Sequence, residues 1–260
     1  MAEVTSHEPG SFTWAELATS DPKAAKAFYT SLFGWTSANS SMGPGPDDIY
    51  TRLQIGGKDV GALCKMKPEQ TAQGVPPNWG TYFTVKSADE TAKKVKAAGG
   101  NVIVEPFDVM DYGRMAVVQG PEGAVFSIWQ PGTHYGFQRM GEDNTAGWTE
   151  LQTTDAAKSG KFLADVFGWP MKVDPSGAYT EFKVGGKSIG GIRPMGGSEP
   201  FPPHWLIYFQ LADCDATVAK AKSLGGTVLM PAMDVEKVGR FAVLADPQGA
   251  AFAVIKLASA

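Results

Sequence analysis

The sequence predicts an α+β fold made of two tandem modules, and three observations support this prediction. A long segment occurs twice in the chain, each copy contains two strand–helix units, and a polar stretch without regular periodicity separates the copies. A helix-bearing sheet has one face that another layer must cover. We therefore expect two similar sheets with helices on their outer faces, whose remaining faces build the functional surfaces.

The repeat is clearest in two segments that end in Phe-Gly-Trp. Residues 12–35 read FTWAELATSDPKAAKAFYTSLFGW and residues 146–169 read AGWTELQTTDAAKSGKFLADVFGW, so Trp14 corresponds to Trp148 at an offset of 134. Self-similarity at fixed offsets indicates that one structural unit was duplicated. Two later pairs of segments, which begin at residues 51 and 180 and at residues 75 and 201, match at offsets of 129 and 126.

The module boundaries follow from the repeat. Residues 130–147 read QPGTHYGFQRMGEDNTAG, which is polar and shows neither helical nor strand periodicity. We assign residues 1–130 to the first module, residues 131–146 to the linker and residues 147–260 to the second module. The offset between the two copies falls from 134 to 129 across residues 40–48 of the first copy. This segment is rich in turn-forming residues, and we interpret it as an inserted loop.

Two helices are expected in each module. Asp21-Pro22 is typical of an N-cap followed by proline at the first helical position, and Phe28 and Leu32 continue at helical spacing to Gly34. The corresponding helix of the second module starts after Asp155. The second helix covers residues 88–98 and stops at Gly99-Gly100, and its copy stops at Gly225-Gly226.

Short stretches rich in β-branched and aromatic residues surround these helices and predict strands. Their order in each module is strand, helix, strands, then strand, helix, strands. In the first module the predicted strands are residues 13–19, 50–55, 60–66, 81–85, 115–118 and 125–129.

The composition excludes several classes of protein. The chain has 260 residues, 43% hydrophobic residues and a formal net charge of −4 with scattered basic residues, so we expect no nucleic-acid partner. No apolar run is long enough to span a membrane and no signal peptide is visible, which makes a cytoplasmic protein the expectation. Cys64 and Cys214 occupy non-equivalent positions, so a disulfide framework is not expected.

Three motifs carry a resemblance to a known family. The run from Glu16 to Trp35, the helix ending at Gly99-Gly100 and the turn Gly120-Pro121-Glu122-Gly123 resemble the vicinal oxygen chelate superfamily of glyoxalases, bleomycin-resistance proteins and extradiol dioxygenases. The resemblance covers essentially the whole chain and extends to two-module glyoxalase-like proteins of actinobacteria. It implies tandem βαβββ modules whose sheets curl into half-barrels, with helices on the outer face.

The same resemblance bears on metal binding. Metal-dependent members of the superfamily carry His or Glu ligands at three inward positions of each sheet, and here these positions hold residues that are not ordinary metal ligands. We therefore expect neither a metal nor another cofactor, although displaced ligands would restore a metal-dependent lyase or dioxygenase. The positions are Trp14, Gly80, Ser127, Trp148, Leu206 and Ala253, and the three histidines of the chain are His7, His134 and His204.

Side-chain alternation along the strands predicts what each concave surface contains. Because successive side chains of a strand point to opposite faces, Trp14 and Glu16 share the inward face, and Tyr82 joins them. An indole, a phenol and a carboxylate suit an aromatic or heterocyclic ligand, although core filling explains the tryptophans equally well. The equivalent residues of the second module are Trp148, Glu150 and Tyr208.

Two roles remain open for the glutamates. Glu16 and Glu150 either form ion pairs, with Arg52 and Lys183 as partners, or act as catalytic general bases whose pKa is raised by desolvation. Arg114 and Arg240 follow a glycine near the mouth of each concave surface. They are candidates for holding an anionic ligand group, with surface solvation as the alternative.

These residues lead to one preferred function and two alternatives. We expect a metal-independent protein, a monomer or homodimer, that binds a small aromatic or heterocyclic molecule and acts on it if the glutamates are catalytic. The first alternative is a metal-dependent enzyme of the same superfamily. The second is a non-catalytic interaction protein that presents loops such as residues 42–48.

Overall fold

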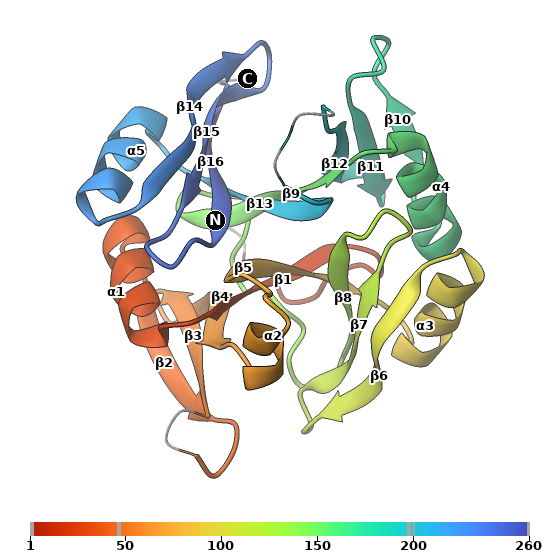
Figure 1. Ribbon diagram of the computed structural model, residues 1–260, viewed down its shortest axis with the longest axis horizontal. Coiled ribbons are helices and arrows are strands. Elements are labelled where there is room, and N and C mark those ends of the chain that lie inside the picture. The colour runs from red at the N-terminus through yellow and green to blue at the C-terminus, as the bar shows by residue number, and fades with distance from the viewer. Residues whose placement is uncertain (1–2, 46–47, 197–198, 200, 259–260) are drawn as a thin grey trace.

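The protein forms two eight-stranded mixed sheets, one in each half of the chain (Figure 1). The computed structural model describes residues 3–45, 48–196, 199 and 201–258. The expected α+β class with repeated modules is confirmed, because both sheets have the same strand order and the same positions for their two long helices. The half-barrel curl stays a prediction.

The first sheet contains the strands from β1 to β8 in the order β2-β3-β4-β1-β5-β8-β7-β6. Strand β1 lies parallel to β4 and antiparallel to β5, which in turn lies parallel to β8. This module therefore consists of two βαβββ units joined through β1 and β5. Its elements are β1 Phe12–Thr19, α1 Pro22–Phe33, β2 Thr36–Ser41, β3 Ile49–Ile55, β4 Lys58–Lys65, α2 Pro68–Ala72, β5 Asn78–Thr84, α3 Ala88–Ala97, β6 Asn101–Val109, β7 Gly113–Gln119 and β8 Val125–Pro131.

The second sheet repeats this topology in the order β10-β11-β12-β9-β13-β16-β15-β14. The chain passes from the first sheet to the second between Pro131, the last residue of β8, and Thr145, the first residue of β9. The elements are β9 Thr145–Thr153, α4 Ala156–Phe167, β10 Met171–Val173, β11 Thr180–Val184, β12 Lys187–Pro194, β13 His204–Gln210, α5 Cys214–Ser223, β14 Thr227–Val235, β15 Gly239–Ala245 and β16 Ala251–Leu257.

The long helices begin and end where the sequence predicts. The Asp21 side chain accepts hydrogen bonds from the amides of Lys23 and Ala24, and Gly34 closes α1 with a left-handed φ of 73°. Strands β2 and β6 and the short helix α2 were not predicted. Strand β2 consists of small polar residues, TSANSS, and therefore lacks the apolar alternation on which strand prediction depends.

Aromatic rings join the two modules into one core. Helices α1 and α5 lie side by side at one flank of the molecule and α3 and α4 at the other, with parts of both sheets meeting between them (Figure 1). The ring of Phe209 in β13 lies 5.1 Å from that of Phe33 and 5.3 Å from that of Trp79, both in the first module. The faces of the sheets that meet here are thus covered by one another.

A buried polar network lies at one side of this interface. The Trp79 indole donates to the Tyr29 hydroxyl at 2.9 Å, and that hydroxyl donates to the Asp246 carboxylate at 3.1 Å. Asp246 also accepts from two amides of its own turn, those of Gln248 and Ala250. Every polar group of this network therefore has a partner, as a buried group requires.

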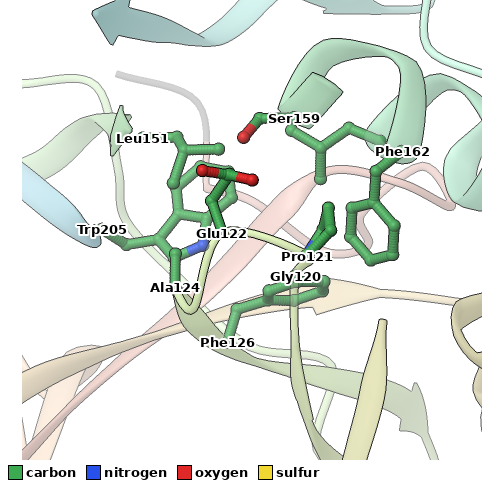
Figure 2. A pocket seen from close by; sticks show the side chains of 10 residues that line it. Gly120, Pro121, Glu122, Ala124, Phe126, Leu151, Ser159, Phe162 and Trp205 are labelled. Atoms are coloured by element: carbon green, nitrogen blue, oxygen red, sulfur yellow. The ribbon is translucent and has the colours of Figure 1, made fainter. Parts of the chain in front are cut away.

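The symmetry-related side of the interface lacks this network. Leu163 stands in place of Tyr29 and Gly120 in place of Asp246, so Trp205, the equivalent of Trp79, loses both polar neighbours. Its indole nitrogen is buried and has no hydrogen-bond partner within the described chain. A small hollow opens at this point, lined by Trp205, Leu163 and the turn at Gly120 (Figure 2).

Rebuilding the missing network should stabilise the protein relative to a variant that has the added ring but no acceptor. Gly120→Asp has room, since a β-carbon there would lie 3.6 Å from its nearest neighbour, a carbon of Phe162. In combination with Leu163→Tyr we expect a free energy of unfolding about 1 kcal/mol higher than in combination with Leu163→Phe, because only the tyrosine hydroxyl gives the Trp205 indole an acceptor. Denaturant unfolding of the single and double variants measures this gain. Gly120→Asp combined with Leu163→Phe is the control, because it adds the same ring without the hydroxyl. Equal stability of the two double variants would contradict the prediction.

Candidate functional site

The face of each sheet that points away from the other module carries a duplicated cluster of aromatic and acidic residues. We call these the first free face, defined by Trp14, Glu16, Tyr50, Cys64 and Tyr82, and the second free face, defined by Trp148, Glu150, Tyr179, Arg193 and Tyr208. The Trp14 indole donates to the Tyr50 hydroxyl at 2.9 Å, and the Trp148 indole donates to the Tyr179 hydroxyl at 3.0 Å. The hydrogen-bond pattern is therefore repeated along with the sequence.

Glu16 is the acidic centre of the first free face. It accepts a hydrogen bond from the Tyr82 hydroxyl at 3.2 Å, and the Cys64 thiol lies 3.7 Å from the same oxygen. Burial raises the pKa of Glu16, while hydrogen bonds from Tyr50 and Tyr82 oppose this rise. Burial and the nearby Glu16 also raise the pKa of Cys64, so its thiol stays protonated and is not an activated nucleophile.

Glu150 is the acidic centre of the second free face and is only 5% exposed. It accepts hydrogen bonds from the Tyr208 hydroxyl at 3.0 Å and from the Gln152 amide, and the Arg193 guanidinium lies 4.0 Å away. Burial raises the pKa of Glu150, and hydrogen bonds from Tyr179 and Tyr208 oppose this rise. Both free faces thus hold a carboxylate whose protonated form is favoured by burial.

The strand register explains how these side chains meet. Trp14 of β1 pairs with Tyr82 of β5, and Trp148 of β9 pairs with Tyr208 of β13, so each indole and phenol lie side by side on one face. Tyr179 lies close over Gly191, where an added β-carbon would come within 2.1 Å of the phenol oxygen. A glycine is required at this position because any side chain would displace Tyr179.

Four residues of the free faces were not predicted from the sequence, namely Tyr50, Cys64, Tyr179 and Arg193. Tyr50 and Tyr179 occupy equivalent positions at the offset of 129, immediately before the segments whose match defines that offset. Extending the two matched segments by one residue toward the N-terminus includes both tyrosines. Arg193 carries no such signal, because the equivalent residue in the first module is Cys64.

The predicted ion-pair partners of the two glutamates, Arg52 and Lys183, were wrong. Arg52 donates to the buried Asp59 at 3.2 Å rather than to Glu16. Arg52 and Asp59 lie on the adjacent strands β3 and β4, whose hairpin brings the two side chains together. Glu16 lies on β1, which is separated from β3 by β4. The cation beside Glu150 is Arg193 rather than Lys183.

Arg114 and Arg240 do not lie at the mouths of the free faces as expected. Arg114 donates to Asp89 at 2.8 Å, and Arg240 donates to Asp215 at 2.8 Å, each aspartate being in the first turn of a helix. Alternation explains this placement, since the next residue along β15, Phe241, packs with the second free face. Both arginines hold helices against sheets.

A segment after β8 closes part of the first free face. We call residues 132–138 the strap. Its His134 ring lies edge-on to Trp14 at 4.8 Å, and its Phe137 ring lies 5.4 Å from the same indole. The Phe137 amide donates to the Thr13 carbonyl at 2.8 Å, which fixes the strap to β1. Trp14 is therefore only 4% exposed and serves as core.

The second free face differs in having its own apolar cluster, which is separate from the main core. Trp148 is only partly buried and shows no ring contact among the described residues. The cluster lies beside Glu150, because Leu206 is the strand partner of Glu150 and the Tyr208 hydroxyl donates to its carboxylate. Its members are Leu206, Tyr208, Ala253 and Ile255, with Trp148, Phe241, Val243 and Ala251 packed against them.

The residues present do not fit the superfamily's metal site. Within the described ranges no three His, Cys, Asp or Glu residues come together in a group that could hold a metal ion. Each free face offers one carboxylate among phenol groups, joined in the first free face by the Cys64 thiol, whose raised pKa disfavours the thiolate. A transition-metal site needs several imidazole, thiolate or carboxylate ligands. His204 and His7 each hydrogen-bond to a backbone carbonyl, those of Pro202 and Phe137, and neither belongs to a group of three possible ligands within the described ranges.

The raised pKa of Glu150 makes a prediction about stability. Between the ordinary glutamate pKa and the raised one, the folded state binds more protons than the unfolded state, so the free energy of unfolding falls as pH rises. We expect Glu150→Gln to remove this dependence. Relative to the variant, the unmodified protein should lose stability as the pH rises above the ordinary glutamate pKa. Denaturant unfolding across this range measures it, and a constant difference would contradict it.

Comparison with known proteins identifies relatives over nearly the full length. A family model described as the Glyoxalase/Bleomycin resistance protein/Dioxygenase superfamily matches residues 11–128 and 145–254. A Mycobacterium tuberculosis protein named "Putative glyoxylase CFP32" is 38% identical over 261 residues, which cover 98% of both chains. The "Anthracycline biosynthesis protein DauV" of a Streptomyces species is 36% identical over 269 residues, covering 99% of this chain and 97% of that protein.

Solved structures share the fold. The Mn(II)-bound glyoxalase from Novosphingobium aromaticivorans superposes with a TM-score of 0.66 at 16% identity, covering 95% of this chain and 82% of that one. The dioxygenase LapB from a Pseudomonas species gives a TM-score of 0.67 at 12% identity, with 97% and 94% covered. At such identities the likeness concerns the fold alone. No described helix combines the length and the apolar character that crossing a bilayer requires.

Proposed function

Because the chain belongs to the glyoxalase/bleomycin resistance protein/dioxygenase superfamily, we propose that its second free face binds a small aromatic or heterocyclic molecule without a metal ion. The observation that supports this most strongly is Glu150, a carboxylate that is 5% exposed and lies beside an apolar cluster. Such a pairing of apolar surface with one oriented polar group is typical of small-molecule sites.

The partial exposure of Trp148 supports the choice of the second free face. The indole nitrogen of Trp148 is held by Tyr179, which fixes the ring plane while leaving part of the ring exposed. In the first free face the strap rings of His134 and Phe137 pack against the corresponding indole. A flat ligand therefore has a stacking surface in the second module that the first module uses for its own side chains.

The names of the relatives support a polycyclic aromatic ligand. Two Streptomyces proteins at 35% and 36% identity are named for anthracycline biosynthesis, and anthracyclines are flat fused-ring compounds. We infer a ligand of this general shape that presents a hydroxyl or amine to Glu150. If the ligand is transformed, the protonatable carboxylate of Glu150 is the group positioned to take or give a proton, with Tyr208 and Tyr179 holding it.

Two alternatives make different predictions. A metal-dependent lyase or dioxygenase would need ligands outside the positions known for the superfamily, and it would lose ligand binding or activity on chelation. An interaction protein would use surface loops such as residues 42–48, of which residues 46 and 47 lie outside the described residues. Such a protein would not bind small aromatic molecules at the second free face.

Calorimetric titration with naphthol, a small fused-ring phenol, tests the proposal. We expect one binding site per chain, because Trp148 is only partly buried, whereas the strap packs against Trp14 in the first free face. Intrinsic tryptophan fluorescence should change on binding, since Trp148 borders the site. Absence of binding at millimolar naphthol would argue for the interaction protein.

A further inference from the structure

The two free faces differ in charge at one pair of equivalent positions. Cys64 in β4 and Arg193 in β12 correspond at the offset of 129, since 193 − 64 = 129. Both lie on the free face, because Cys64 contacts Glu16 and Arg193 lies 4.0 Å from Glu150. The second free face therefore has a permanent positive charge at the place where the first has a neutral thiol.

Arg193 connects the buried carboxylate to the open edge of the second free face. Its Nε donates to the Gln152 side chain, which in turn donates to Glu150. Its two terminal nitrogens donate to the carboxylate of Glu199 at 3.1 and 2.9 Å. The Arg193 side chain is 40% exposed, so a dissolved molecule can reach the guanidinium.

We propose that the second free face selects aromatic ligands that carry an anionic group, such as a carboxylate, and that Arg193 holds this group in place of Glu199. This inference rests on the proposed function, because the aromatic part of the ligand needs the Trp148 surface. The planar guanidinium fork already binds one carboxylate side by side, and the same geometry fits the carboxylate of a ligand.

The exchange is energetically reasonable. The Glu199 side chain is 28% exposed, so water can solvate its carboxylate when Arg193 releases it. The ligand carboxylate replaces its hydrogen bonds, while the ring adds apolar contact. Repulsion from Glu150 is limited because burial favours the protonated form of its carboxyl group.

The test compares two probes of the same shape, the anionic naphthoate and the neutral naphthamide, by calorimetric titration of the full chain. We expect naphthoate to bind about tenfold more tightly, the usual contribution of a hydrogen bond to a charged group. Arg193→Gln should weaken naphthoate binding until it no longer exceeds naphthamide binding to the same variant, which removes the preference. Glu199→Gln should tighten naphthoate binding about two- to fivefold, because the competing carboxylate is gone.

Arg240 offers a matched control. It also binds two carboxylates, those of Asp215 and Asp234, but on the helix side of the sheet, so Arg240→Gln should leave both probes unaffected. Equal affinity for both probes, with binding still dependent on Trp148, would overturn the inference and leave the proposed function standing. Tighter binding of naphthamide would also overturn it. Failure of both probes to bind would overturn the inference and the proposed function together.

Discussion

Phe209→Ala is expected to lower the free energy of unfolding by about 3–5 kcal/mol, the usual cost of removing a buried phenylalanine ring. Phe209 is fully buried and lies 5.1 Å from Phe33, 5.3 Å from Trp79 and 6.1 Å from Phe252, measured between ring centroids. Its ring therefore contributes to the core of both modules. The cavity left by alanine cannot collapse easily, because large rings held by two sheets surround it.

Denaturant unfolding measures this loss, and Phe241→Ala provides the comparison. Phe241 is a partly buried phenylalanine of the same sheet that faces the second free face instead of the module interface. We expect its removal to cost about half as much or less, since less apolar surface is buried. If Phe209→Ala cost less than about 1 kcal/mol, the modules would not share a core of the kind that their aromatic contacts indicate.

Trp148→Ala should weaken naphthol binding about tenfold or more, which corresponds to ~1.4 kcal/mol or more. The physical reason is that the ligand loses its stacking surface, and the hydrogen bond from the indole that orients Tyr179 is lost with it. Because Trp148 is only partly buried, the protein should remain folded. Calorimetric titration gives the affinity, and circular dichroism checks the fold.

The equivalent change in the first module, Trp14→Ala, should lower stability rather than the affinity for naphthol. Trp14 is 4% exposed beneath the strap, so its loss should destabilise the protein by about 3–5 kcal/mol while leaving the affinity for naphthol unchanged. The two substitutions remove the same side chain from equivalent positions. If both weakened binding equally, the ligand would occupy both free faces, and if neither did, it would bind elsewhere.

Local signals in the sequence were sufficient for much of the fold. The repeat predicted two similar modules, Asp21 and Gly34 predicted the ends of α1, and strand alternation placed Trp14, Glu16 and Tyr82 on one face. Each of these features depends on residues close together in the chain or on the repeat itself. Strand β2 was missed because its residues are polar and mostly exposed.

Contacts that depend on pairing between distant strands could not be predicted in the same way. Arg193 meets Gln152 because β12 lies parallel to β9 in one register, which no local pattern reveals. Arg52 was assigned to Glu16 because both were expected to face inward, yet Asp59 is closer across the β3–β4 hairpin. The strap was assigned to a linker because its residues lack periodicity, although His134 packs against Trp14.

Naphthol titration of protein dialysed against a chelator, with and without added Mn²⁺, tests the central claim most directly. The described residues around Glu150 offer one carboxylate and two phenols, a donor set that does not fit the superfamily's metal. We predict one site per chain with the same affinity before chelation, after chelation and after Mn²⁺ is added. Loss of binding on chelation and its return with Mn²⁺ would contradict the account and favour the metal-dependent enzyme.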